Sequence, residues 1–252
     1  MLETIEAIRF VTPLREGGSL PGVMEGDDFG TWVVKFRGAG QGLKVLVAEV
    51  IVGELARALG LKVPQLKVIE VPEQIARYEA DEEVQDLLTA SVGLNLAVDF
   101  LPGAFGYDGE HPPSADEAAT IMWLDAFTAN VDRTPANPNL LRWHGDTWCI
   151  DHGAALYFHH SWPSRGSHPE RFAAQPFDSS THIMRGVVTD LPSAHDRLST
   201  LVTTGLLTEV VAQVPDAWLE PTADLPDAES VRAAYIANLV ARLANPEAWS
   251  PR

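Results

Sequence analysis

The sequence predicts an α+β protein in which a strand-rich first half precedes a helix-rich second half. Alternating apolar and polar residues over 4–10 and an apolar run over 31–36 indicate strands. Apolar residues at helical spacing mark 43–60 and, in the second half, 182–215 and 227–244. The 252 residues suffice for one large domain or for two small lobes that share a cleft.

Charge and composition exclude several classes of function. The chain has 35 acidic and 18 basic residues, a formal net charge of −17. We expect no nucleic-acid-binding surface, because neutralising phosphates needs a basic face, and no association with anionic membranes. The single cysteine cannot form an internal disulfide, and the N-terminus has no long apolar run. We therefore expect a cytoplasmic protein.

The stretch 15–30, with five glycines and one proline, is predicted to be a loop between the first two strands. Glycine has no Cβ, so the backbone N–H groups of such a loop can closely approach phosphate oxygens. Ser19 could add a hydroxyl donor. The alternative interpretation is an ordinary flexible connection in a hairpin.

Two charged residues follow among apolar neighbours. Lys35 lies in the predicted strand 31–36, where burial is costly unless the ammonium group meets an anion. Glu49 lies on or beside the apolar stripe of the predicted helix 43–60, and its carboxylate needs a cation. We predict that Glu49 holds Lys35 in place for a phosphate. The alternative is that both residues are solvent-exposed, on an edge strand and on a helix surface.

The first half ends with two more predicted strands, 66–71 and 92–103, separated by an acidic and helical segment over 72–90. A Pro-Gly pair ends the second of these strands, and in a two-lobed protein the chain could cross between the lobes there. Backbone groups at this crossing could then meet the edge of a nucleobase. These groups belong to Asp99, Phe100 and Leu101.

Residues 121–153 contain the densest group of side chains suited to chemistry. An apolar helical segment leads into a polar loop, and two short apolar runs then end at Asp151. In a phosphotransferase one carboxylate takes or orients the proton of the attacking hydroxyl. An amide oxygen and a second carboxylate hold Mg²⁺, which prefers hard oxygen ligands. Asp132, Asn137 and Asp151 are the candidates for these three roles.

Two other interpretations of this stretch are open. Asx-turns would explain its asparagines but not the lysine, glutamate and glycine-rich loop that precede it in order. A metal-dependent phosphohydrolase could use Asp125, Asp132 and Asp151. Such an enzyme would have no use for the glycine-rich loop or for Lys35.

The tripeptide His144-Gly145-Asp146 resembles the start of the catalytic loop of aminoglycoside kinases. That motif requires an asparagine five positions after its aspartate, and here the position is Asp151. We predict instead that His144-Gly145-Asp146 forms the turn of a hairpin between 140–143 and 147–150.

Taken together, the ordered motifs resemble the HipA-like kinases, relatives of the phosphoinositide 3/4-kinase branch of the protein-kinase-like fold. The matching segments are Val33-Val34-Lys35-Phe36, Ala48-Glu49, Leu59-Gly60-Leu61-Lys62-Val63-Pro64, Asn130-Val131-Asp132-Arg133-Thr134-Pro135-Ala136-Asn137 and Ile150-Asp151-His152-Gly153. The family's loop reads roughly Asn-x-Asp-Arg-His-x-x-Asn, so Thr134 replaces a histidine, which could alter the orientation of Asp132. His152 replaces the phenylalanine of the lipid-kinase Ile-Asp-Phe-Gly.

The resemblance implies a two-lobed protein-kinase-like fold, with a small β-rich N-lobe over 1–101 and a mostly helical C-lobe over 102–252. It implies ATP and Mg²⁺ as cofactors and a Ser/Thr hydroxyl of a protein as the phosphate acceptor. A small-molecule or lipid kinase on the same scaffold and a non-catalytic pseudokinase that only binds nucleotide are the alternatives.

The resemblance also implies a role for each matching residue. Gly17, Gly18 and Ser19 would cover the phosphates, and Ser19 would be a candidate for autophosphorylation. Lys35, with Glu49 as its partner, would contact the α- and β-phosphates. Asp132 would be the catalytic base, and Arg133 would steady the loop or the transferred phosphoryl group. Asn137 and Asp151 would be ligands of Mg²⁺.

Overall fold

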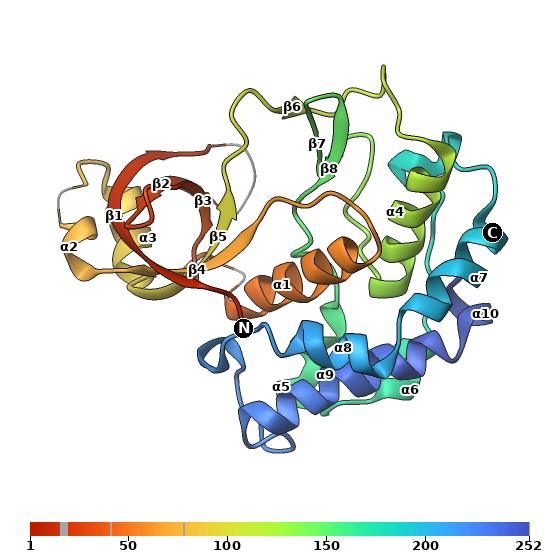
Figure 1. Ribbon diagram of the computed structural model, residues 1–252. Coiled ribbons are helices and arrows are strands. Elements are labelled where there is room, and N and C mark those ends of the chain that lie inside the picture. The colour runs from red at the N-terminus through yellow and green to blue at the C-terminus, as the bar shows by residue number, and fades with distance from the viewer. Residues whose placement is uncertain (16–19, 41, 78, 252) are drawn as a thin grey trace. The chain divides into compact units, whose positions relative to one another are not determined.

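The computed structural model describes residues 1–15, 20–40, 42–77 and 79–251 (Figure 1). The chain forms two compact units, one made of 1–47 and 64–102 and the other of 48–63 and 103–252. The predicted lobe boundary between residues 101 and 102 stays a prediction. Within the described ranges, no helix has the length and apolar character needed to cross a membrane.

The first unit is a closed five-stranded barrel with the strand order β1-β2-β3-β5-β4 (Figure 1). Its strands are β1 (Thr4–Pro13), β2 (Gly22–Gly26), β3 (Thr31–Lys35), β4 (Leu66–Val71) and β5 (Gly93–Asp99). Neighbouring strands are antiparallel, except that β1 and β4 are parallel and so close the barrel. The strands predicted around 4–10, 31–36, 66–71 and 92–103 are thereby confirmed.

The period-two pattern of β3 decides which of its side chains enter the core. Trp32 and Val34 are buried in the apolar cluster of the barrel, whereas Val33 and Lys35 alternate with them and are only partly buried. The helices α2 (Glu73–Ala76) and α3 (Glu82–Ala90) pack apolar side chains against the same cluster. They confirm the helical prediction for 72–90, with a break between them.

Part of the stretch predicted to be a glycine-rich loop is a strand, and the prediction was wrong there. Residues 22–26 form β2, which pairs with both β1 and β3. A Cβ atom on Gly22 would lie 2.5 Å from the ring of Phe10 and 3.1 Å from that of Phe36. Gly22 therefore permits close packing against these rings, which the sequence cannot distinguish from a need for flexibility.

Helix α1 (Leu43–Ala58) confirms the helix predicted over 43–60. It ends in a left-handed turn at Gly60, where φ is +87°, and the N–H of Leu61 bonds back to the carbonyl of Ala56 (3.0 Å). The first residues of α1 belong to the first unit, and its residues from 48 onward belong to the second.

The second unit is mainly helical. Its helices are α4 (Ala115–Thr128), α5 (Trp162–Arg165), α6 (Pro169–Ala173), α7 (Leu191–Leu201), α8 (Thr204–Val211), α9 (Ala228–Leu243) and α10 (Pro246–Trp249), with short 3-10 helices at Tyr157–Ser161, Ile183–Gly186 and Asp216–Trp218. A small sheet is formed by β6 (Phe105–Gly106), β7 (Leu140–Trp143) and β8 (Asp146–Cys149). Helices α7 and α8 lie within 182–215, with non-helical breaks, and α9 occupies the helix predicted over 227–244.

Helix α4 forms the core of the second unit and is held at its C-terminal end by Arg242 of α9. The buried Arg242 guanidinium donates to the carbonyls of Ala126 (Nη2, 2.7 Å) and Phe172 (Nη1, 2.6 Å). Burial lowers the pKa of Arg242 to about 10. Trp123 stacks on Phe127 with ring centroids 5.1 Å apart. These contacts fix the helix that leads into the polar loop of residues 130–139.

The predicted hairpin after that loop is confirmed. His144 and Gly145 link β7 to β8 with φ values of +50° and +84°, as a tight two-residue turn requires. Arg142 donates to the hydroxyl of Thr147 (2.7 Å) and to the carbonyl of Gly145 (2.6 Å). The hairpin thus presents residues 150–153 from a hydrogen-bonded pair of strands.

Candidate active site

The polar loop begins where α4 ends. Ser114 caps the start of α4 by accepting from the N–H of Glu117 (3.2 Å). At the other end Ala129 takes a left-handed conformation with φ of +56°, and the N–H of Asn130 bonds to the carbonyl of Asp125 (2.8 Å). The chain leaves the helix with its last turn closed, which gives the loop a fixed starting point.

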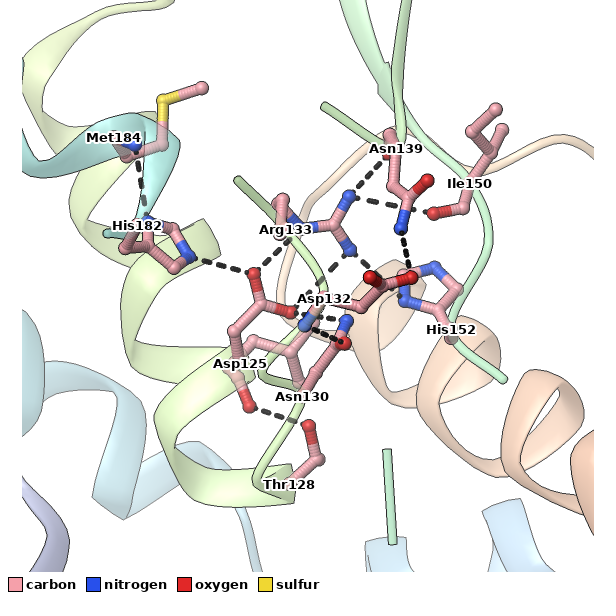
Figure 2. A network of polar contacts seen from close by, with 11 residues as sticks. Asp125, Thr128, Asn130, Asp132, Arg133, Asn139, Ile150, His152, His182 and Met184 are labelled. Carbon is pink, nitrogen blue, oxygen red and sulfur yellow. Dashed lines mark hydrogen bonds and ion pairs between the residues drawn. The ribbon is translucent and has the colours of Figure 1, made fainter. Parts of the chain in front are cut away.

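Asp132 is exposed, and two asparagines fix one of its carboxylate oxygens. Its Oδ2 accepts from Nδ2 of Asn137 (2.8 Å) and from Nδ2 of Asn139 (3.3 Å). Figure 2 shows the contact with Asn139. Its backbone N–H donates to Oδ1 of Asn130 (3.3 Å). The carboxylate therefore has a defined orientation.

A tight turn places Asn137 beside Asp132. The N–H and carbonyl of Thr134 bond to the carbonyl and N–H of Asn137 at 3.0 and 3.1 Å, with Pro135 at the second position of the turn. The hydroxyl of Thr134 also accepts from the N–H of Asn137 (3.2 Å). Thr134, which departs from the family's histidine, thus takes part in closing the turn that carries Asn137.

Arg133 points the opposite way, into the interior of the second unit. Its Nε donates to Oδ2 of Asp125 (2.6 Å) and its Nη2 to Oδ1 of the same carboxylate (3.4 Å), with both side chains fully buried. Burial alone would raise the pKa of Asp125, but the charge of Arg133 and hydrogen bonds from His182 and Arg133 outweigh it and lower this pKa to about 2. Asp125 is thus an ionised partner of a buried arginine, which argues against the role of metal ligand that a phosphohydrolase would require.

The other nitrogens of Arg133 tie the loop to the segment that carries Asp151. Nη1 donates to the carbonyls of Asn139 and Ile150, the latter at 3.4 Å, and Nη2 lies 3.4 Å from Nδ1 of His152. Figure 2 shows the guanidinium between Asp125 on one side and these groups on the other. The contacts support loop steadying over phosphoryl contact as the role of Arg133.

Asp151 is exposed and lies between two anchored peptide groups. The preceding carbonyl, of Ile150, accepts from Arg133, and the following N–H, of His152, donates to Oε2 of Glu49 (3.0 Å). Asp151 itself has a left-handed φ of +54°, a conformation that aspartate tolerates better than most residues. The anchors hold this carboxylate at the end of the hairpin.

The other predicted nucleotide-binding residues that the structure describes are divided between the two units. Lys35 is partly buried on β3, opposite Leu96 of β5. Glu49 belongs to the second unit, with only 4% of its surface exposed. The predicted Lys35–Glu49 pair stays a prediction, and Gly17, Gly18 and Ser19 lie outside the described residues.

The predicted nucleobase-contacting backbone lies at the end of β5. The N–H of Asp99 bonds to the carbonyl of Gln65 (2.9 Å) and the N–H of Phe100 to the carbonyl of Thr31 (3.1 Å). These two residues would therefore have to contact a base through their carbonyl groups. Leu101 follows and is 7% exposed.

Sequence reasoning missed two residues of this network. Asn139 was explained only by turn formation, although a second asparagine two positions after Asn137 was a signal available in the sequence. His182 lies 57 positions from Asp125 in the chain, yet its Nε2 is 2.9 Å from Oδ2 of Asp125. No local pattern reveals that contact.

Comparison with known proteins assigns the chain to a family. A family model described as HipA-like kinase matches residues 7–252. The chain belongs to the HipA-like kinase family. The resemblance noted in the sequence is thereby confirmed, and the protein is a kinase, that is, a phosphotransferase. A search of curated proteins gave no match.

Solved structures show the fold of this HipA-like kinase. The Helicobacter pylori proinflammatory kinase CtkA is similar, with a TM-score of 0.57 and 12% identity, over 95% of this chain and 94% of CtkA. The Golgi casein kinase, solved with Mn and ADP bound, gives a TM-score of 0.44 and 11% identity over 96% of this chain and 72% of its own. The likeness to CtkA confirms a protein-kinase-like fold, β-rich in its N-terminal part and helical in its C-terminal part.

Proposed function

We propose that this HipA-like kinase transfers the γ-phosphoryl group of ATP, with Mg²⁺, to a Ser or Thr hydroxyl of a protein. The observation that carries the proposal is the exposed Asp132 carboxylate, of which one oxygen is fixed by Asn137 and Asn139. Two amide donors on Oδ2 leave Oδ1 to orient the attacking hydroxyl and receive its proton, as expected of a kinase catalytic base.

Asn137 and Asp151 would hold the metal. Because Nδ2 of Asn137 donates to Asp132, the amide oxygen is the atom with which Asn137 can bind a cation. Asp151 adds an exposed carboxylate, and both are the hard oxygen ligands that Mg²⁺ prefers. When bound, Mg²⁺ would neutralise charge on the phosphates. Arg133 and Glu49 would keep the Asp151 segment in place through the peptide groups on either side of it.

In the N-terminal part, Lys35 would contact the α- and β-phosphates with Glu49 as its partner. Carbonyl groups of Asp99 and Phe100, with the backbone of Leu101, would contact the nucleobase. Gly17, Gly18 and Ser19 would cover the phosphates, with Ser19 as a site of autophosphorylation. These assignments rest on the family resemblance and on the order of the motifs in the chain.

Thermal melting with ATP and Mg²⁺, with GTP and Mg²⁺, and with no nucleotide tests the nucleotide and metal assignments. A ligand that binds only the native state raises the melting midpoint. At 100 times the Kd the expected rise is roughly 5 °C or more for a chain of this size. The rise with ATP should require Mg²⁺ and be lost in Asp151→Ala. No rise with any nucleotide would contradict the proposal.

The acceptor class is tested separately by incubating the protein with γ-labelled ATP and a dephosphorylated protein rich in Ser and Thr, followed by phosphoamino acid analysis. Labelled phosphoserine or phosphothreonine is the expected product. Label transferred only to small-molecule alcohols or to lipid, with none in protein, would reject the protein acceptor and favour the small-molecule or lipid kinase.

A further inference from the structure

We propose that the segment His182–Met184 clamps the catalytic loop, and that His182 is a positioning residue for phosphoryl transfer. The inference rests on the proposed function of the loop that carries Asp132. The segment opens a short 3-10 helix, Ile183–Gly186, and contacts the loop through both a side chain and the backbone.

The hydrogen bonds of His182 determine its tautomer. His182 is 6% exposed, and its Nδ1 accepts from the N–H of Met184 (3.1 Å). A backbone N–H can only donate, so Nδ1 carries no proton and the neutral ring has its proton on Nε2. Nε2 lies 2.9 Å from Oδ2 of Asp125 and therefore donates to that carboxylate.

The clamp reaches Arg133 in two ways. Oδ2 of Asp125 accepts from His182 and also from Nε of Arg133 (2.6 Å), so His182 fixes the carboxylate that holds the arginine side chain. In addition, the N–H of Ile183 donates to the carbonyl of Arg133 (3.2 Å). Figure 2 shows His182 and Met184 on the side of Asp125 away from Asn139 and His152.

Both contacts act next to the proposed catalytic base, because Arg133 directly follows Asp132. With its side chain and its carbonyl held, Arg133 cannot turn without breaking a buried hydrogen bond. The peptide group that joins it to Asp132 is held as well, because the carbonyl of Asp132 accepts from the N–H of Thr134 (3.1 Å). A displacement of about 1 Å at a reacting group can cost roughly 100-fold in rate, so a clamp at this position would act on the chemical step.

Two substitutions separate the two hydrogen bonds of the ring. His182→Asn can place an amide oxygen near the position of Nδ1 and keep the bond from Met184, but it is too short to donate to Asp125. His182→Gln can place an amide nitrogen near the position of Nε2 and restore that donor. The matched control is His195→Asn, because Nδ1 of His195 accepts from Nε1 of Trp123 on the same helix α4 (3.0 Å).

The first readout is hydrogen exchange of residues 130–139 in the nucleotide-free protein, which needs no activity. We expect roughly tenfold faster exchange in this loop for His182→Asn, the effect of losing one hydrogen bond to a buried carboxylate. We expect near wild-type exchange for His182→Gln and no change in the loop for His195→Asn. Equal exchange in wild type and His182→Asn would overturn the clamp.

The second readout is the kinetics of phosphoryl transfer. In His182→Asn we expect kcat to fall tenfold or more while the KM for ATP stays within about twofold, and His182→Gln should recover most of kcat. A lower melting midpoint with uniformly faster exchange and unchanged kcat would indicate a merely structural role. If wild type transfers no phosphate, the proposed function fails, and the exchange result still decides whether the clamp exists.

Discussion

Asp125 and Arg133 form a fully buried ion pair, with Oδ2 and Nε 2.6 Å apart. Asp125 lies in the last turn of the core helix α4, and Arg133 follows the proposed catalytic base. The pair therefore joins the core of the second unit to the polar loop of residues 130–139. Arg133 also holds the carbonyls of Asn139 and Ile150. Through these contacts a single guanidinium fixes the segments that carry Asp132, Asn137 and Asp151.

Replacing Arg133 by Ala should destabilise the second unit strongly. Removing one partner of a buried pair leaves the other charge uncompensated, at a cost of about 3–5 kcal/mol. Arg197→Ala is the control, because Arg197 forms an exposed ion pair with Asp116 at 2.6 Å, and such pairs contribute under about 1 kcal/mol. Urea unfolding followed by tryptophan fluorescence measures the free energy of unfolding of both variants. A similar decrease in this free energy in the two variants would contradict a dominant role for the buried pair.

The pair should also make stability depend on pH in the acid range. The pKa of Asp125 is lowered from 3.8 to about 2 in the folded protein. A lowered pKa means that the stabilisation is present above pH 3.8 and is lost as pH falls toward about 2. The unfolding free energies of wild type and Asp125→Asn should therefore converge over this window, and a constant difference from pH 6 to pH 2 would be evidence against the ionised pair.

Asn139 should matter for the rate of transfer more than for nucleotide binding. Asn139→Gly removes the Nδ2 donor to Asp132 (3.3 Å) and retains a residue suited to the left-handed φ of +51°. We expect kcat to fall roughly tenfold, as for one lost hydrogen bond to a charged group, with the Kd for ATP within about twofold. Asn245→Ala, which loses a bond to the carbonyl of Ala173 (3.2 Å), is the control. An unchanged kcat in Asn139→Gly would show that Asn137 alone orients Asp132.

The elements that follow from local chemistry were predictable from the sequence. Gly60 ends α1, Ser114 starts α4, and His144-Gly145 makes the hairpin turn, each by a rule that involves only neighbouring residues. The strand β2 was not predictable, because the requirement for Gly22 comes from the rings of Phe10 and Phe36, which are brought to it by the fold.

The same distinction applies to the site. Asp132, Asn137 and Asp151 could be proposed as site residues because the loop and the hairpin are continuous in sequence and their spacing is characteristic. The buried contacts that hold their loop were not predicted. In the sequence Asp125 is only a polar residue on an apolar helix, and its partner His182 comes from a segment far along the chain. Buried polar networks are specified by tertiary packing, and a single sequence carries no periodic signal for them.

The most direct test of the central claim is phosphate transfer from γ-labelled ATP by wild type, Asp132→Asn and Asp146→Asn, each at a saturating Mg²⁺–ATP concentration. Asp146 provides a sharp control, because it lies in the hairpin turn that resembles another kinase motif and forms an ion pair with Lys62. We predict that Asp132→Asn loses transfer by roughly 100-fold or more while Mg²⁺–ATP still raises its melting midpoint, and that Asp146→Asn transfers at close to the wild-type rate. Transfer by Asp132→Asn at the wild-type rate would contradict the assignment of the catalytic loop.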